Sequence, residues 1–547
     1  MRPRQTRTRG TGSLPRRATA SALALALLAA LTLAACTDSG GNGSGSSGGT
    51  GDDGAGSPHT LRVLASSELS DMEPVLEEAR KATGVTVEPT YVGTLDAVEQ
   101  IASGAAEKSY DAVWLSSNDY LRLRPDTARK ITAETPIMTS PVALGLRPQT
   151  VKALGWDPAE VTWSQIHRAV VEKKLGYGMT DPARSNSGFT ALVSIASGLS
   201  GAQSALTEKD VAAATPKLKE FFGGQHLTSG SSGWLATAWA RRTDVDALIN
   251  YESVLLSTGK ELTVVRPVDG VVTADYPFTL LTAAGPDAKQ AAARLTAHLR
   301  TPVAQRMITN RTLRRPVVPG VEPAKPLTTD QRRELPFPGS RAVADGLLDA
   351  YENKLRRPSR TVYVLDTSGS MEGERLARLR SALAELTGDF RDRETVTLMP
   401  FGSAVKQREV RTYTVDPAAP TKAIDAMRAQ AGGLSASGGT AIYSSLEEAY
   451  GHLGAATGAQ GRGDGGTFTS IVLMTDGENT DGEPAGAFDA FYRELPPAQQ
   501  RTPVFPIVFG DSDRAALGHI ASLTGGRLFD ATQGSLDGAF EEIRGYQ

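Results

Sequence analysis

Hydroxyl and carboxylate side chains gather at three points in the last third of the sequence. At the first point an aspartate and two serines alternate, with a glycine that permits a tight turn between the serines. At the second a threonine follows two glycines, and at the third an aspartate follows an apolar run. Mg²⁺ prefers six oxygen ligands and gives up its water reluctantly, so neutral hydroxyls would hold it while leaving its charge largely uncompensated. The candidate metal ligands are Asp366, Ser368, Ser370, Thr440 and Asp476.

The elements that must position these residues alternate between strand and helix. TVYVL at 361–365 predicts a strand that ends at Asp366, and leucines spaced along one face predict a helix over 374–389. Further strands are predicted at 395–402, 410–415, 469–475, 502–510 and 526–531, with helices at 421–429, 441–453 and 535–546. This order indicates a doubly wound sheet, whose ligands lie at the carboxyl ends of the strands.

The set Asp-x-Ser-x-Ser, Thr and Asp resembles the metal-ion-dependent adhesion site of von Willebrand factor A domains, over residues 359–547. The resemblance implies a Rossmann-like fold that holds Mg²⁺, with Mn²⁺ or Ca²⁺ as alternatives. It implies that Asp366 and Asp476 act mostly through water or through hydrogen bonds to the other ligands. It also implies an open position on the ion that accepts a carboxylate from a protein partner.

Hydroxyl groups also end strand-like stretches in the middle of the sequence. Strands predicted at 61–66, 85–88 and 110–115 alternate with helices at 72–83 and 94–104, which indicates a parallel α/β sheet. Hydroxyls and backbone N–H groups at helix N-termini hold anions, and residues 185–188 are expected to cap the helix that follows Pro182. The candidate ligand-binding residues are Ser66, Ser67, Ser116, Ser117, Ser185, Ser187 and Tyr251.

Five stretches, RVLASSELSD, YDAVWLSSND, TDPARSNSGFTAL, LINYES and TADYPF, resemble extracellular solute-binding proteins of ABC importers, in the branch with molybdate- and sulfate-type binders. The resemblance runs from about residue 60 to 310. It implies a two-lobed, periplasmic-binding-protein-like fold, with crossings between the lobes near 140–142 and 264–268. Glu252 beside Tyr251 would repel an anion or favour a cationic or hydroxylated solute, so the solute stays open.

The first 58 residues predict export and anchoring. A basic, arginine-containing start precedes an apolar run at 18–35 that ends in Leu33-Ala34-Ala35-Cys36, and Cys36 is the single cysteine. The pattern is typical of an export signal and resembles the lipobox of bacterial lipoproteins, which implies a diacylglycerol on the Cys36 sulfur. A plain secretory signal or an uncleaved anchor is the alternative. The Gly/Ser-rich segment 37–58 predicts a flexible tether.

These patterns divide the chain into a signal peptide at 1–36, a tether at 37–58, a solute-binding-like domain at 59–315, a proline-rich connector and helix at 316–358, and an A domain at 359–547. The formal charge is −3 and becomes more negative without the arginines of 1–35, so nucleic acid is a poor partner. A single cysteine excludes an internal disulfide framework.

The function we expect is that of a lipid-anchored protein on the extracellular face of the cell membrane. Its A domain would bind an acidic residue of a protein partner through a metal ion, and its middle domain would bind or sense a small solute. The alternative is a solute receptor of an ABC importer. We recognise no serine paired with a general base and no Gly-x-Ser-x-Gly elbow at the end of a predicted strand, so we expect no enzymatic activity and assign no catalytic residue.

Overall fold

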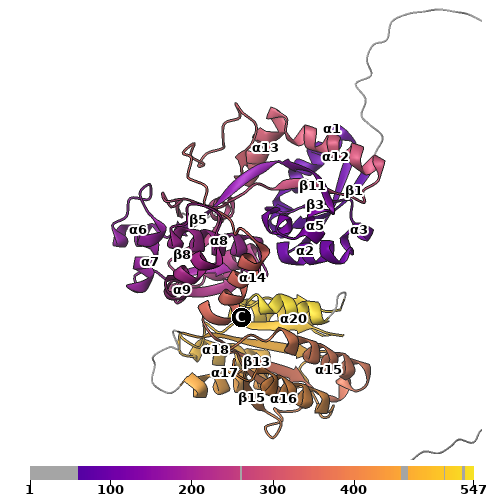
Figure 1. The fold of residues 1–547 in the computed structure, drawn as a ribbon. Coiled ribbons are helices and arrows are strands. Elements are labelled where there is room, and N and C mark those ends of the chain that lie inside the picture. Colours follow the sequence, from indigo (N-terminus) through magenta and orange to yellow (C-terminus); the bar gives the residue numbers. More distant parts are fainter. Residues whose placement is uncertain (1–58, 259–261, 458–465, 511, 533–535, 547) are drawn as a thin grey trace, which may run out of the picture. The chain divides into compact units, whose positions relative to one another are not determined.

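The computed structural model describes residues 59–546, except 259–261, 458–465, 511 and 533–535 (Figure 1). The expected signal peptide, the lipidation site at Cys36 and the tether therefore lie outside the described residues. Within the described part of the chain, no helix has both the length and the apolar character that crossing a membrane requires.

The first sheet of the middle domain has the strand order β2-β1-β3-β11-β4. Its strands are β1 (His59–Ser66), β2 (Val85–Val92), β3 (Ala112–Trp114), β4 (Ile131–Pro136) and β11 (Pro277–Leu281). Strands β1, β2 and β3 are parallel, whereas β11 runs antiparallel to β3 and β4. The expectation of a parallel sheet is therefore wrong for its far side, because β11 comes back from the second lobe in the opposite direction.

Helices surround this sheet and fill its connections (Figure 1). They are α1 (Glu73–Thr83), α2 (Thr94–Ser103), α3 (Ala106–Ser109), α4 (Asp119–Arg122), α5 (Pro125–Ala128), α12 (Pro286–Leu299) and α13 (Pro302–Thr312). The β1–α1 connection contains a 3₁₀ turn over Ser67–Met72. Apolar side chains of β1, such as Leu61 and Val63, are fully buried in the core that these elements share.

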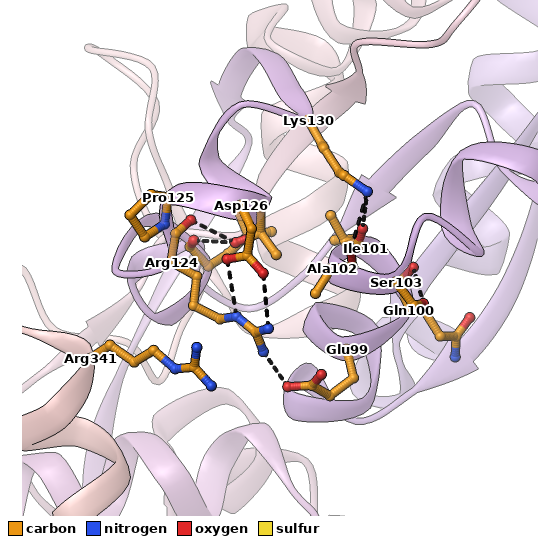
Figure 2. A network of polar contacts seen from close by, with 12 residues as sticks. Glu99, Gln100, Ile101, Ala102, Ser103, Arg124, Pro125, Asp126, Lys130 and Arg341 are labelled. Atoms are coloured by element: carbon orange, nitrogen blue, oxygen red, sulfur yellow. Dashed lines mark hydrogen bonds and ion pairs between the residues drawn. The ribbon is translucent and has the colours of Figure 1, made fainter.

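A polar network joins two of these short helices at the edge of the first lobe. The guanidinium of Arg124, a residue only 6% exposed, pairs with Asp126 and with Glu99 of α2. Figure 2 shows these contacts, together with Lys130, which donates to the carbonyl oxygens of Ile101 and Ala102. Because the last carbonyls of a helix have no partner within the helix, Lys130 satisfies two of them and fixes the end of α2.

The second sheet has the order β10-β5-β8-β6-β7, with β9 and β12 also paired to β5. Its strands are β5 (Met138–Leu146), β6 (Tyr177–Thr180), β7 (Gln225–Ser229), β8 (Ala247–Tyr251), β9 (Thr263–Val265), β10 (Thr273–Ala274) and β12 (Arg315–Pro316). Its helices are α6 (Pro148–Leu154), α7 (Trp163–Val171), α8 (Asn186–Ser200), α9 (Glu208–Phe222), α10 (Ser232–Trp239) and α11 (Glu252–Ser257). Helix α14 (Arg341–Ala350) follows the proline-rich segment and continues as a π turn over Tyr351–Leu355.

The chain crosses between the two sheets twice. The first crossing lies between β4 and β5, at residue 137, close to the expected position. The second was expected at 264–268, and that expectation is wrong: β9 stays in the second sheet, where Val265 pairs with Leu144. The chain returns only after β10, which still pairs with β5, and before β11, which pairs with β3. The hinge is therefore formed by residue 137 and the segment 275–276.

The last domain is a six-stranded sheet with the order β15-β14-β13-β16-β17-β18. All neighbours are parallel except β15, which is antiparallel to β14 at the edge. The strands are β13 (Ser359–Asp366), β14 (Thr395–Phe401), β15 (Arg411–Thr414), β16 (Phe468–Thr475), β17 (Val504–Val508) and β18 (Phe529–Asp530). This arrangement confirms the predicted doubly wound α/β fold.

Helices cover both faces of this sheet, since alternate residues of β13 belong to different apolar cores. Tyr363 and Leu365 lie in the core under α15 (Glu374–Leu386), α16 (Pro420–Gly433) and α20 (Leu536–Arg544). Val362 and Val364 lie in the core under α17 (Ile442–Thr457), α18 (Ala485–Glu494) and α19 (Arg514–Thr524). A strand buried on both faces leaves only its end for polar chemistry, and β13 ends at Asp366.

Candidate functional site

Three loops meet at the carboxyl end of the six-stranded sheet. Strand β13 ends at Asp366, and β16, its parallel neighbour, ends at Thr475, directly before Asp476. Thr440 lies two residues before helix α17. Because the ends of parallel neighbours lie side by side, residues more than 100 positions apart come together here.

Hydrogen bonds join the candidate ligands from the first and third loops. The hydroxyl oxygens of Ser368 and Ser370 are 2.9 Å apart, and the Ser370 hydroxyl donates to Oδ1 of Asp476 at 2.8 Å. Oδ1 of Asp366 accepts the backbone N–H of Ser368 at 2.8 Å. The structure thus brings the aspartates and the serines into one connected cluster.

Thr440 faces the same space from the second loop. A Cβ atom added to Gly477 would lie 3.9 Å from Oγ of Ser370 and 3.9 Å from Oγ1 of Thr440, so glycine leaves the space between the two hydroxyls open. The loop is held by Asn479, whose Oδ1 accepts the N–H of Ile442 at 2.8 Å, and by Thr480, whose hydroxyl accepts the N–H of Thr440 at 2.9 Å.

The cluster has a buried floor and an exposed rim. Four of its side chains belong to residues at most 4% exposed, whereas Ser370 is exposed. Burial raises the pKa of Asp366, and hydrogen bonds from Ser368 and Thr475 oppose that rise. A carboxylate held in this way gains from a nearby cation.

The donor set suits a hard divalent cation, since it combines three hydroxyls with two carboxylates, and the hydroxyls of Ser370 and Thr440 both lie 3.9 Å from the Cβ position at Gly477. Among the described residues, no group of three or more His, Cys, Asp or Glu side chains is placed to hold a metal ion. Hydroxyl oxygens would therefore have to supply much of the coordination here.

The sequence patterns did not identify Arg375 as part of this cluster. Its Nη1 lies 2.6 Å from Oδ2 of Asp476. A cavity of about 320 Å³ opens beside it, lined by Ser370, Glu372, Glu374, Arg375 and Arg378. An arginine in the first turn of a helix gives no local signal of this role, because its partner lies 101 positions away.

In the middle domain, Ser66 and Ser116 come together at the ends of β1 and β3. The Ser66 hydroxyl accepts the N–H of Ser116 at 3.0 Å and a hydrogen bond from the side-chain amide of Asn186. The carbonyl oxygen of that amide accepts the N–H of Thr94. Asn186 is the first residue of α8, in the second lobe, so one amide ties the two lobes together.

The other candidate residues divide between two places. Ser187 is buried and lies within 3.2 Å of the hydroxyls of Thr180, Ser185 and Ser232. The Tyr251 hydroxyl lies 2.9 Å from that of Thr190, and burial raises the Tyr251 pKa well above its usual range. Ser185 precedes α8 but makes no side-chain cap, contrary to expectation.

Two of the candidate serines take no part in the described hydrogen bonds of Ser66 and Asn186. Ser67 is exposed, and Ser117 bonds Asp119, with its hydroxyl 2.8 Å from Oδ2. They share no described hydrogen bond with Ser66 or Asn186.

The expectation for Glu252 is wrong. Both of its carboxylate oxygens pair with Arg315, at 2.8 and 2.9 Å, and Arg266 lies 3.4 Å away. Its charge is therefore matched by two guanidinium groups and cannot decide the sign of a solute.

Glu68 is the carboxylate that faces this region instead. Burial raises its pKa. Its Oε1 is buried without a hydrogen-bond partner in the described structure, while its Oε2 accepts from Asn186 at 3.4 Å.

Two family models match the chain. Residues 61–311 match the bacterial extracellular solute-binding protein family, and residues 362–542 match the von Willebrand factor type A domain. These matches confirm the two resemblances found in the sequence.

Curated relatives match only part of the chain. The inter-alpha-trypsin inhibitor heavy chain H4 of Sus scrofa is 32% identical over 127 residues, which are 23% of this chain and 13% of that protein. An uncharacterized protein of Synechocystis is 31% identical over 134 residues, which are 24% of this chain and 29% of that protein. This chain therefore spans less than a third of either relative.

Solved structures show similar partial matches. The periplasmic binding protein AfuA from Actinobacillus pleuropneumoniae, bound to fructose-6-phosphate, has 14% identity and a TM-score of 0.44, covering 55% of this chain and 99% of that one. A von Willebrand factor type A structure from Catenulispora acidiphila has 18% identity and a TM-score of 0.29, covering 35% of this chain and 42% of that one. On the family matches, the chain joins a bacterial extracellular solute-binding domain to a von Willebrand factor type A domain.

Proposed function

We propose that this protein is a membrane-anchored extracellular binding protein without enzymatic activity. Its A domain binds an acidic side chain of a protein partner through a divalent cation, which we take to be Mg²⁺, with Mn²⁺ or Ca²⁺ as substitutes. Its solute-binding domain captures or senses a small solute. Cys36 carries the lipid that holds the chain at the outer face of the membrane.

The observation that carries the proposal is the convergence of Asp366, Ser368, Ser370, Thr440 and Asp476 at one sheet edge. Ser370 shares hydrogen bonds with Ser368 and Asp476, and the space beside it is open to Thr440. Neutral hydroxyls compensate little of a cation's charge, so a cation held here would retain its attraction for a carboxylate. Both matched families are binding or adhesion families rather than enzyme families.

Isothermal titration calorimetry of the full chain with Mn²⁺ tests the metal site. Ser370→Ala removes an exposed hydroxyl from the cluster, and we expect it to weaken Mn²⁺ binding by about tenfold or more. Ser435→Ala is the matched control, because Ser435 is an exposed serine of the same domain outside the cluster. A wild-type chain without saturable Mn²⁺ binding would overturn the proposal.

The partner's chemistry has its own test. Peptides that carry one aspartate should bind the wild-type chain in Mg²⁺ and lose binding in EDTA, and the same peptides with asparagine should not bind. Equal binding of the aspartate and asparagine peptides would rule out a carboxylate as the recognised group.

The match over residues 61–311 also favours a second function, a solute receptor that delivers its ligand to an ABC importer. Thermal shift of the full chain against a solute panel finds the ligand in either case. Transport of that solute, lost on deletion of this protein and restored by a chain with Ser370→Ala, would favour the receptor role. Transport that continues unchanged after deletion of this protein would favour adhesion.

A third measurement tests the anchor. Cys36→Ser should release the protein from the membrane fraction into the medium or leave it unprocessed, as judged by fractionation and by mass spectrometry of the N-terminus. Retention of a processed Cys36→Ser chain in the membrane would contradict lipid attachment at this residue.

A further inference from the structure

Arg375 places a permanent positive charge inside the candidate metal cluster. Its Nη1 is 2.6 Å from Oδ2 of Asp476, whose side chain is fully buried, while the arginine side chain is 35% exposed. Oδ1 of the same carboxylate accepts the Ser370 hydroxyl at 2.8 Å. Asp476 therefore meets a candidate ligand on one oxygen and a guanidinium, which stays charged at any physiological pH, on the other.

The backbone makes room for this guanidinium. Gly510 follows β17 and has φ +69°, a left-handed conformation that favours glycine. A Cβ atom at Gly510 would lie 3.2 Å from Cζ of Arg375 and 3.3 Å from Cβ of Asp476. The glycine thus lets the arginine lie against the loop beside the carboxylate.

Two cations that share one carboxylate repel each other. A divalent ion held by Ser370 and its neighbours would lie beside Arg375, and the repulsion would weaken its binding. The same positive charges would together attract an incoming anion more strongly than the ion alone. Resting on the proposed function of this cluster, we propose that Arg375 is a specificity residue that lowers the affinity for the cation alone and gives an incoming carboxylate a second positive group.

The charges that line the adjoining cavity limit which partner peptides can bind there. Its volume is about 320 Å³, and its lining includes the exposed acids Glu372 and Glu374 beside Arg375 and Arg378. Counted with Asp476, which pairs with Arg375, this wall carries three carboxylates against two guanidinium groups, so a run of further acidic residues in the partner would be repelled. The fitting ligand is a peptide segment with one carboxylate between neutral or basic residues.

Mn²⁺ titration of the full chain distinguishes the effect of Arg375 on cation binding from that of Arg378. Arg375→Gln keeps a hydrogen-bond donor and removes the charge, and we expect it to bind Mn²⁺ about tenfold more tightly than the wild type. Arg378→Gln is the matched control: Arg378 lines the same cavity, and its guanidinium lies 4.7 Å from the Phe509 ring. Its Mn²⁺ affinity should stay within about twofold of the wild type, because it has no described contact with Asp476.

Unchanged or weaker Mn²⁺ binding by Arg375→Gln, with the wild type binding normally, would overturn the role of Arg375 and leave the metal site standing. Absence of Mn²⁺ binding in the wild type and in both variants would overturn the proposed function and this inference together. Tight binding by Arg375→Gln alone would support the inference strongly.

A second experiment tests whether Arg375 contacts the partner's carboxylate. It uses two immobilised peptides at saturating Mn²⁺, one with a single aspartate among glycines and serines and one with three consecutive aspartates. The wild type should prefer the single-aspartate peptide, and Arg375→Gln should bind it several-fold more weakly despite its tighter Mn²⁺ binding. Equal affinity of wild type and Arg375→Gln for that peptide would show that the guanidinium does not contact the ligand.

Discussion

The hydroxyl of Thr475, the last residue of β16, donates to Oδ2 of Asp366, the last residue of β13, at 2.6 Å. Both residues are fully buried. The bond joins two neighbouring strands at the level where the candidate metal ligands begin, and it fixes the direction in which the Asp366 carboxylate points. Its loss should therefore affect both folding and cation binding.

Thr475→Val keeps the shape of the side chain and removes the donor. Because a buried carboxylate oxygen then loses its partner, we expect the free energy of unfolding to fall by about 1–3 kcal/mol. Mn²⁺ affinity should fall with it. Circular dichroism during urea unfolding and Mn²⁺ calorimetry measure the two effects.

Thr361→Val is the control on the same strand pair, since the Thr361 hydroxyl lies 3.1 Å from that of Ser470 and both residues are buried. Its partner is neutral, so the loss should be no more than about 1.5 kcal/mol, with Mn²⁺ affinity unchanged. An equal fall in Mn²⁺ affinity for both variants would contradict the role given to Thr475.

Gly402→Ala tests the packing behind Thr440. A Cβ at Gly402 would lie 2.4 Å from the carbonyl oxygen of Ser437, a backbone atom that can move only with its loop. We expect a loss of about 1–3 kcal/mol in unfolding free energy, as for other overpacked sites, and weaker Mn²⁺ binding.

Gly432→Ala is the matched change for this test. Gly432 lies in α16, where an added Cβ has no neighbour within 4 Å, so alanine should stabilise the helix by about 0.5–1 kcal/mol. Equal unfolding free energies for Gly402→Ala and Gly432→Ala would show that the loops of Gly402 and Ser437 do not lie as close together as in the structure.

Glu252→Gln breaks the charge balance with Arg315 and Arg266. The residue is 4% exposed, and removing one partner of a buried pair leaves uncompensated charge, which costs about 3–5 kcal/mol. All five tryptophans lie between residues 114 and 239, so tryptophan fluorescence in urea follows mainly this domain. Trp234 also contacts Phe505 and Tyr546 of the last domain.

Glu172→Gln provides the comparison, because Glu172 pairs with Lys174 at 2.8 Å on the surface. That change should leave the fluorescence midpoint unaltered, since exposed ion pairs contribute little. A Glu252→Gln midpoint equal to that of Glu172→Gln would mean that the pair with Arg315 is solvated.

Asp275 predicts a pH dependence at the hinge. Its pKa is raised to about 6, because burial penalises the charged form and the Asp119 carboxylate repels it, against attraction from Arg122. Because the folded state holds the Asp275 proton more tightly than the unfolded state, this group stabilises the fold fully below pH 3.8, the ordinary pKa of aspartate. The stabilisation is lost as the pH rises through about 6.

Between pH 4.5 and 7.5 the wild type should therefore lose about 2 kcal/mol relative to Asp275→Asn, which has no charge to bury. Urea unfolding of both chains at the two pH values, followed by tryptophan fluorescence, measures the difference. Parallel stability profiles for the two chains would show that Asp275 titrates normally.

The sequence predicted those parts of the molecule that depend on local pattern. Asp366, Ser368 and Ser370 could be named as candidates because a buried strand must end where alternate polar residues begin, and the structure brings them together. The doubly wound order followed from strands that alternate with helices. The part played by Arg375 could not be predicted, since a long side chain can reach many partners and its partner Asp476 is distant in sequence.

The errors in the middle domain have the same cause. Val264 and Val265 have the composition of a hinge strand, yet they pair with β5, and only long-range strand pairing decides this. Glu252 was expected to repel an anion or favour a cationic or hydroxylated solute, because the local sequence does not show its partner Arg315, which lies 63 positions away. Local composition identifies an acid, but its net charge in the fold depends on which side chains arrive beside it.

The burial of four of the five candidate ligands has a kinetic consequence. These four side chains are already packed inside the domain without an ion, so we expect an arriving ion to be held with little rearrangement of the three loops. Only Ser370 stands in solvent. The association rate of Mg²⁺ should then be governed by how fast the ion sheds its own water. Mn²⁺ and Ca²⁺ exchange water faster than Mg²⁺ and should enter sooner, whatever their final affinity.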